Sequence, residues 1–205
     1  MQKSWRQDSD KLTFIVCLPI TPAPSTPATP PSQSRKSVKS QEYDDSDRMI
    51  GDVNLFITEP NTIEEEEKGI CVGELELMIA VPSARRKGRG RATIVAFLLY
   101  ISSHVQTILS EYSSPQTQSE SLDPEKRRKR WEGLQLRVKI GEENEKSLKL
   151  FESLGFRKVS DTVSYFGEWE LWFDGLLGMN GNGEERIAEL HRRFGGEEYE
   201  EMRYD

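Results

Sequence analysis

The sequence predicts an α+β fold, because segments with the period of a β-strand alternate along the chain with segments of helical spacing. Apolar and polar residues alternate over Leu75–Val81, the period-two pattern of a half-buried strand, and Pro82 ends it. Apolar residues at helical spacing follow over Arg91–Leu109. A second strand pattern at Leu134–Ile140 and a second helical pattern opened by Asn144 repeat this order.

Flanking segments add four strands to this plan. Lys11–Leu18 has the composition of a buried strand, and Met49–Thr58 is a strand whose Asp52 and Asn54 share one face. Those two polar side chains either line a cleft or simply face solvent. We expect the acidic run Glu64–Glu67 to be a hairpin loop, and two closing strands at Phe156–Val159 and Val163–Phe173.

Composition limits how much of the chain can pack. Of 205 residues, 35% are hydrophobic and 31% are charged, which favours one domain with disordered segments. We expect a folded domain over 1–173 with disordered inserts at 19–47 and 110–132, then an acidic, Gly-rich tail over 174–205 with a short helix near Glu184–Phe194. The first insert could be regulatory and Lys126–Arg130 could be a nuclear-import signal, but plain solvated insertions explain both.

Charge and cysteine usage exclude several classes of partner. The net charge of −7 argues against general attraction to nucleic acid or to an anionic membrane. Cys17 and Cys71 lie in strand-like runs without metal-ligand spacing, so we expect buried thiols and no metal site. We expect no membrane span and no signal sequence, with a cytoplasmic location, or a nuclear one, as the default.

The basic turn after the first strand pattern is the strongest candidate for ligand binding. Arg85–Gly90 places four cations and two glycines directly before a helix. Glycines let backbone N–H groups approach an anion, and the helix N-terminus attracts the same charge, so a pyrophosphate fits here. A solvated basic loop that only joins strand to helix fits a lone R-x-x-G-x-G equally well.

A second motif follows it in the order that one superfamily uses. The helix at 144–156 carries N-x-x-S-x-x-x-F-x-x-x-G-F, and together the two motifs resemble the GNAT-type N-acetyltransferases. The blocks MIGDVNLFIT, GELELMIAVPSARRKGRG and KIGEENEKSLKLFESLGF are most similar to the N-acetyltransferase 9-like family. The resemblance implies a three-layer fold: a twisted mixed, largely antiparallel sheet flanked by helices, with acetyl-CoA in a V between two central strands. The family's first strand and two helices have no counterpart here, so we expect an N-terminally truncated version.

The resemblance also assigns roles to residues. It implies that the backbone of Ile79 and Val81 pairs with the pantetheine arm, that the Val81 N–H polarises the thioester carbonyl, and that a second group of residues contacts the cofactor from the far side. The pyrophosphate-binding residues are Arg85, Arg86, Lys87, Gly88, Arg89 and Gly90, and the second group is Asn144, Ser147 and Phe151. Asn144 could also be only a helix N-cap. Phe151 stands where many such enzymes have a tyrosine general acid, and it has no proton to give.

The reaction implied is attack of an amine on the thioester, which needs a base for the ammonium proton. Glu76 is the first candidate and Glu74 the second, although either could be an ordinary exposed strand residue. The acceptor implied is a protein or peptide amine, and the family suggests an α-tubulin N-terminus. The alternative is a weak or inactive interaction protein that keeps the fold, as Phe151 suggests. Nucleic-acid binding through Arg85–Arg91 and Lys126–Arg130 is the third hypothesis, and the net acidity and the absence of interleaved aromatic residues argue against it.

Overall fold

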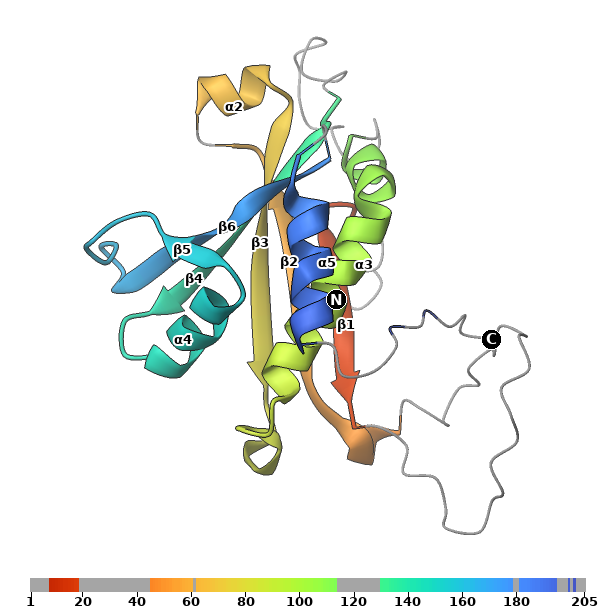
Figure 1. Ribbon diagram of the computed structural model, residues 1–205, viewed down its shortest axis with the longest axis vertical. Helices are drawn as coiled ribbons and strands as arrows, with labels where there is room; N and C mark the ends of the chain where they lie inside the picture. The colour runs from red at the N-terminus through yellow and green to blue at the C-terminus, as the bar shows by residue number, and fades with distance from the viewer. Residues whose placement is uncertain are drawn as a thin grey trace.

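A six-stranded mixed sheet forms the centre of the protein in the computed structural model, with the strand order β1-β2-β3-β4-β6-β5 (Figure 1). The structure describes residues 8–18, 45–60, 62–113, 130–178, 181–194, 199 and 201. The strands are β1 (Lys11–Cys17), β2 (Met49–Thr58), β3 (Ile70–Ile79), β4 (Gly133–Gly141), β5 (Phe156–Lys158) and β6 (Glu168–Gly178). Only β3 and β4 pair in parallel; all other neighbours are antiparallel, which confirms the mixed, largely antiparallel sheet.

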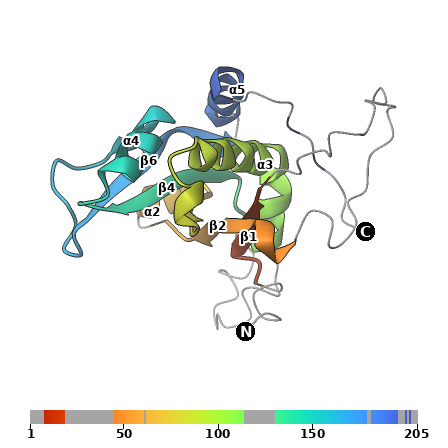
Figure 2. The same cartoon turned by 90° about the horizontal axis from the view of Figure 1, so that it is seen from below.

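The helices lie beside this sheet. They are α2 (Ile63–Glu67), α3 (Arg89–Tyr112), α4 (Glu145–Ser153) and α5 (Gly183–Phe194), with one-turn 3₁₀ helices η1 (Ser46–Arg48) and η2 (Pro82–Ala84). Helices α3 and α5 run side by side and pack against strands of the sheet in both views (Figures 1 and 2). Helix α4 lies near the N-terminal end of α3, where Leu150 approaches Gly90.

Helix α3 supplies much of the hydrophobic core. Its buried side chains recur at helical spacing and meet the apolar faces of β2, β3 and β4 around Leu55, Leu75 and Leu136. By length and composition alone α3 could also cross a membrane, a criterion that a buried core helix satisfies as well. In this structure, however, its apolar residues lie in the core of the domain.

Three strand and loop predictions need correction. Strand β1 is an edge strand whose central residues are exposed, Phe14 by 38% and Ile15 by 55%, because only one side of it pairs with another described strand. The acidic run between β2 and β3 does lie within a hairpin, but it forms helix α2, capped by the Thr62 hydroxyl accepting from Glu65 N–H. The last strand starts at Glu168, because Gly167 has φ +71° and Tyr165 lies in an exposed turn.

The folded region also extends past its predicted end. The boundary placed at residue 173 falls inside β6, and α5 packs against both α3 and β6, with Ile187 buried in the core. The predicted inserts lie mostly in 19–44 and 114–129, outside the described residues. At their ends, α3 continues to Tyr112 and Trp131 is buried, so the chain is ordered at those positions.

Candidate active site

A cleft opens where the two central parallel strands separate. The register of β3 and β4 runs from Ile70–Gly133 to Glu74–Arg137 and then stops, although both strands continue. The cleft beyond this point has a volume of about 360 Å³. Its lining comes from β2, β3, β4 and α4: Asp52, Leu75, Glu76, Leu77, Met78, Val138, Lys139, Ile140, Gly141, Asn144, Ser147 and Phe151. This is the V-shaped opening that the resemblance implied.

Backbone groups of β3 face into this cleft. The Ala80 N–H donates to the Ile50 carbonyl next to the Gly51–Ile79 pair, so Ile79 is a residue whose own N–H points away from β2. By alternation Leu77 also presents its backbone to the gap. The Val81 N–H donates to the same Ile50 carbonyl at 3.2 Å. The role expected of Val81, polarising a thioester, therefore does not fit this geometry, whereas Ile79 is well placed.

The basic turn has a specific structure. The Arg85 guanidinium donates to the carbonyl oxygens of Ile79 and Ala80, at 2.7 and 3.1 Å, and so holds the turn against the end of β3. Arg86 adopts φ +60°, and it and Lys87 are exposed. Arg89 is half-buried and donates to the Ala84 carbonyl at 3.4 Å. Arg85 is thus a structural residue here although it too is exposed, and Arg86 and Lys87 are the other exposed cations of the turn.

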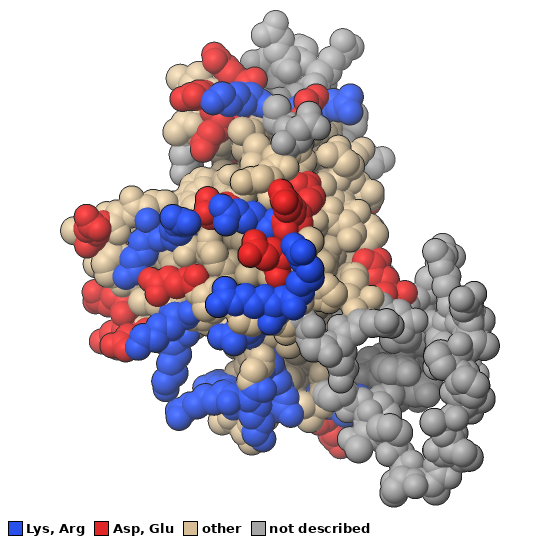
Figure 3. Space-filling view, viewed as in Figure 1, with Lys and Arg blue, Asp and Glu red and all other residues tan. Residues whose placement is uncertain are grey.

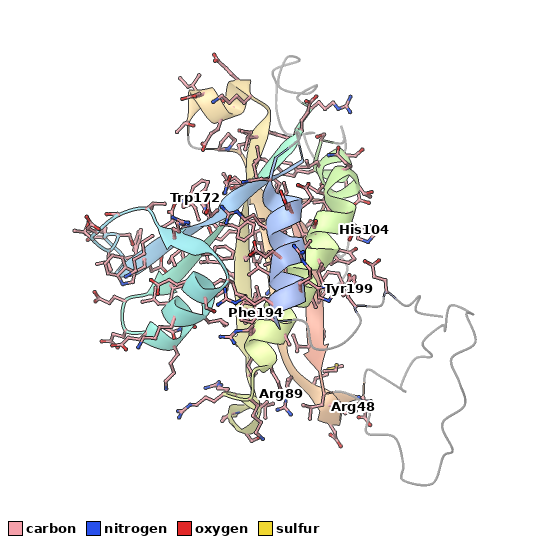
Figure 4. The ribbon with its side chains drawn as sticks, in the orientation of Figure 1. Arg48, Arg89, His104, Trp172, Phe194 and Tyr199 are labelled. Carbon is pink, nitrogen blue, oxygen red and sulfur yellow. The ribbon has the colours of Figure 1, made fainter. Side chains whose placement is uncertain are left out.

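The turn delivers these cations to the N-terminus of α3. Gly88 is the N-cap with φ +78° and has no side chain to occupy the first N–H groups of the helix. Those donors and the positive end of the helix dipole are therefore available to an anion. Lys and Arg gather at this end of the molecule (Figure 3), and Arg89 lies at the lower end of α3 (Figure 4). The exposed cations and the first N–H groups of α3 together suit the binding of a pyrophosphate.

Helix α4 closes the other side of the cleft. The Asn144 side chain accepts from the Ser147 N–H at 3.2 Å, so Asn144 is an N-cap, and both residues also line the cleft. Phe151 is 5% exposed and its ring packs edge-on against Phe156 at 5.2 Å. Phe151 therefore has a packing role, and it gives the site no proton donor.

The two glutamates that the sequence nominated have different surroundings. The Glu74 carboxylate is within 3.0 Å of both Arg137 Nε and Lys139 Nζ, and its side chain is only 18% exposed. Glu76 makes no ion pair with any described residue. Partial burial, and then the charges of Glu74 and Asp52, raise the pKa of Glu76, while Lys139 opposes them. A carboxylate with a raised pKa and no cation bound to it is the better proton acceptor.

The splayed parallel strand pair, the basic turn before the uncapped N-terminus of α3 and the glutamate in the cleft are the arrangement that the resemblance to GNAT-type acetyltransferases implied. No protein-family model matches the chain. Sequence comparison finds N-acetyltransferase 9-like proteins of Schizosaccharomyces pombe, 36% identical over 83% of this chain and 73% of that protein, and of Dictyostelium discoideum, 30% identical over 93% and 68%. The human alpha/beta-tubulin-N-acetyltransferase 9 is 33% identical over 82% of this chain and 58% of that protein.

The chain therefore belongs to the N-acetyltransferase 9-like family of N-acetyltransferases. It spans 58% of the human relative, less than two thirds of that protein. Among solved structures, a dodecameric spermidine N-acetyltransferase from Vibrio cholerae overlaps 83% of this chain and 68% of that chain at 16% identity and a TM-score of 0.41. Arabidopsis thaliana NAA60 in complex with acetyl-CoA overlaps 66% and 69% at 16% identity and a TM-score of 0.33. The structural similarity is too low to support the assignment to the family, which depends on the sequence relatives alone.

Arg137 and Lys139 are site residues that the sequence did not nominate. Both stand at polar positions of the β4 alternation, which is the pattern of solvent-facing residues. Their importance comes from the register of β4 on β3, which puts Arg137 opposite Glu74. The sequence offered one indication that they meet: β3 carries glutamates and β4 carries Arg and Lys, and opposite charges favour pairing across neighbouring strands.

Proposed function

We propose that this protein transfers the acetyl group of acetyl-CoA to a free amine of a protein or peptide. The observation that carries the proposal is the contrast between two glutamates of β3. Glu74 is bound by two cations, while Glu76, which lines the cleft, has no ion-pair partner among the described residues and a raised pKa. A base that must take a proton from an ammonium group near neutral pH needs this kind of surrounding.

The residues at the mouth of the cleft fit the cosubstrate. Arg86, Lys87 and the first N–H groups of α3 would hold the pyrophosphate, and the backbone of Leu77 and Ile79 would hydrogen-bond the extended arm. Acetyl-CoA supplies an activated acyl group and a thiolate leaving group. Ile79 N–H is the backbone donor placed to stabilise charge on the carbonyl oxygen.

Glu76 would perform the proton step. It accepts one proton from the acceptor's ammonium group, and the lone pair released on nitrogen then forms the new C–N bond while the C–S bond breaks. The bonding electron pair leaves with the sulfur as a thiolate. The nitrogen then loses its second proton to water as the amide forms, and the thiolate takes a proton from water because Phe151 cannot give one. The names of the relatives suggest tubulin as the acceptor, and we propose the amino terminus of α-tubulin as the first acceptor to test.

Replacing Glu76 tests the proposal. Glu76→Gln should lower kcat at least ~100-fold, the typical contribution of a general base, and leave the acetyl-CoA Kd from isothermal titration unchanged. Wild-type kcat should rise with pH through a midpoint above the ordinary pKa of a glutamate, because the protonated carboxyl cannot accept a proton, and this limb should vanish in the variant. Glu152→Gln, an exposed change on α4, is the matched control. Failure of the folded wild type to bind acetyl-CoA would refute the proposal.

Phe151 favours a second candidate, a protein that binds acetyl-CoA but turns it over slowly. A buried phenyl ring stands where a proton donor would help the thiolate leave. Under this alternative acetyl-CoA binds, the wild type forms at most traces of acetylated peptide, and Glu76→Gln changes neither the binding nor that trace. Mass spectrometry of the peptide after incubation separates the two candidates.

A further inference from the structure

Asp52 of β2 lines the cleft on the side away from β4, and Asn54 lies two residues further along the same strand. Asp52 pairs with Met78 across the sheet and Asn54 pairs with Glu76, so all four side chains share one face. Asp52 is therefore the diagonal neighbour of Glu76, and it lines the same cleft. The other wall of the cleft, β4 and α4, is the side on which we place the cosubstrate.

Asn54 is a polar residue in a buried position of β2, where an apolar side chain would pack equally well. It is 8% exposed, and its Nδ2 donates to Asp52 Oδ2 at 2.8 Å. Its Oδ1 is buried and has no hydrogen-bond partner among the described residues. A buried amide oxygen without a donor is destabilising, and an apolar side chain would fill the position at lower cost. The amide thus fixes the Asp52 carboxylate at the expense of folding stability.

Hydrogen-bond acceptors dominate this part of the cleft. The carboxylates of Asp52 and Glu76 both line the cleft, and neither forms an ion pair with a described residue. Lys139, the cation that lines the cleft beside them, is held at 3.0 Å by Glu74. A ligand that fits must therefore bring several donors and a positive charge, as a primary ammonium group does.

We propose that Asp52, oriented by Asn54, binds the acceptor amine in its ammonium form beside Glu76. The inference rests on the proposed function and names its acceptor class: a chain end or side chain carrying a free, protonated primary amine. Asp52 contacts the ammonium group and holds it, Glu76 removes one of its protons, and Asn54 is a positioning residue that acts through Asp52. A hydroxyl or an already acetylated amine lacks the charge and is rejected.

Peptide binding tests the inference without requiring turnover. A synthetic α-tubulin amino-terminal peptide and its N-acetylated counterpart are titrated into the full chain, with and without saturating CoA. The free-amine peptide should bind at least tenfold more tightly than the acetylated one, and Asp52→Asn should reduce this preference to less than threefold while the acetyl-CoA Kd stays within twofold. Asp161→Asn, the same change in the exposed β5–β6 loop, should keep the full preference.

The outcomes separate the two proposals. Absence of a preference in the wild type, or a preference that Asp52→Asn retains, overturns the inference even if acetyl-CoA binds. Failure of acetyl-CoA to bind overturns the proposed function, while the preference measured without CoA still reports on Asp52. Asn54→Leu should leave the Tm unchanged or raise it and weaken the preference at least threefold. A lower Tm with full preference would show that Asn54 serves folding alone.

Discussion

Single residues acquire their roles in this protein from their neighbours across the sheet. Glu74 and Glu76 have the same chemistry and the same face of β3, yet only Glu74 meets Arg137 and Lys139. The Arg137 side chain is 11% exposed, so Glu74 compensates a charge that is largely removed from water. We therefore assign Glu74 to stability and Glu76 to chemistry.

Glu74→Gln should lower the stability of the fold and leave the proton transfer to Glu76 in place. Loss of the carboxylate leaves Arg137 without its charge partner, and we expect the free energy of unfolding to fall by about 3 kcal/mol. Urea unfolding followed by circular dichroism measures this. Glu170→Gln, on the neighbouring strand β6 and half-buried, is the control and should change stability by less. A Glu74→Gln variant of wild-type stability would contradict the assignment.

At the scale of elements, the turn between β3 and α3 combines one side-chain contact with two unusual backbone positions. Arg85 fastens the turn to the end of β3, Arg86 has φ +60° and Gly88 has φ +78°. A positive φ is costly for a residue with a Cβ, so Gly88 is required by its backbone conformation. Gly90, already inside α3, is not: a Cβ there would meet Leu77 and Leu150 at 3.4 and 3.5 Å, ordinary contact distances.

The two glycines should therefore respond differently to alanine. Gly88→Ala should lower the free energy of unfolding by about 1 kcal/mol, from conformation alone, since the described residues beyond the adjacent backbone place no atom within 4 Å of the new Cβ. Gly90→Ala should leave stability unchanged or raise it by about 0.5 kcal/mol, because alanine is the better helix former. Thermal unfolding of both variants under one condition gives the comparison. Equal losses at the two positions would show that the helix N-terminus is strained throughout.

At the scale of the whole molecule, α5 belongs to the folded domain. It packs beside α3, where the Arg91 guanidinium lies 4.7 Å from the centre of the Phe194 ring, and Ile187 is 1% exposed. Figure 4 shows Phe194 near the middle of the molecule. Further along the chain, the Glu201 carboxylate lies 2.9 Å from His104 Nε2 of α3 and accepts a hydrogen bond from the Tyr199 hydroxyl at 2.7 Å. Residues placed by sequence in an acidic tail thus complete the core.

Ile187→Ala tests how far α5 contributes. Removing a buried isoleucine should lower the free energy of unfolding by about 3 kcal/mol, through lost apolar burial and a residual cavity. Glu189→Ala, exposed on the same helix, should change it by less than about 0.5 kcal/mol. Denaturant unfolding monitored by tryptophan fluorescence provides both values. If Ile187→Ala is neutral, α5 is not part of the cooperative unit.

Much of the architecture could be predicted because local patterns determine it. Period-two alternation placed β2, β3 and β4, helical spacing placed α3 and α4, and Gly155, with φ +87°, ends α4 as its sequence position suggests. The pattern failed at β1, since an edge strand and a buried strand have similar compositions. It also failed at α2, where a Thr62 cap converts an acidic run into a helical turn.

The sequence by itself determined the order of strands and helices, the Gly-rich basic turn and the family to which the paired motifs point. Only the tertiary structure decided which polar residues meet, because alternation fixes the face of a strand but neither its neighbour nor its register. The pairing of β3 with β4 ends at Glu74 and Arg137. That one register opens the cleft, binds Glu74 to two cations, and leaves Glu76 inside the cleft with Asp52 beside it.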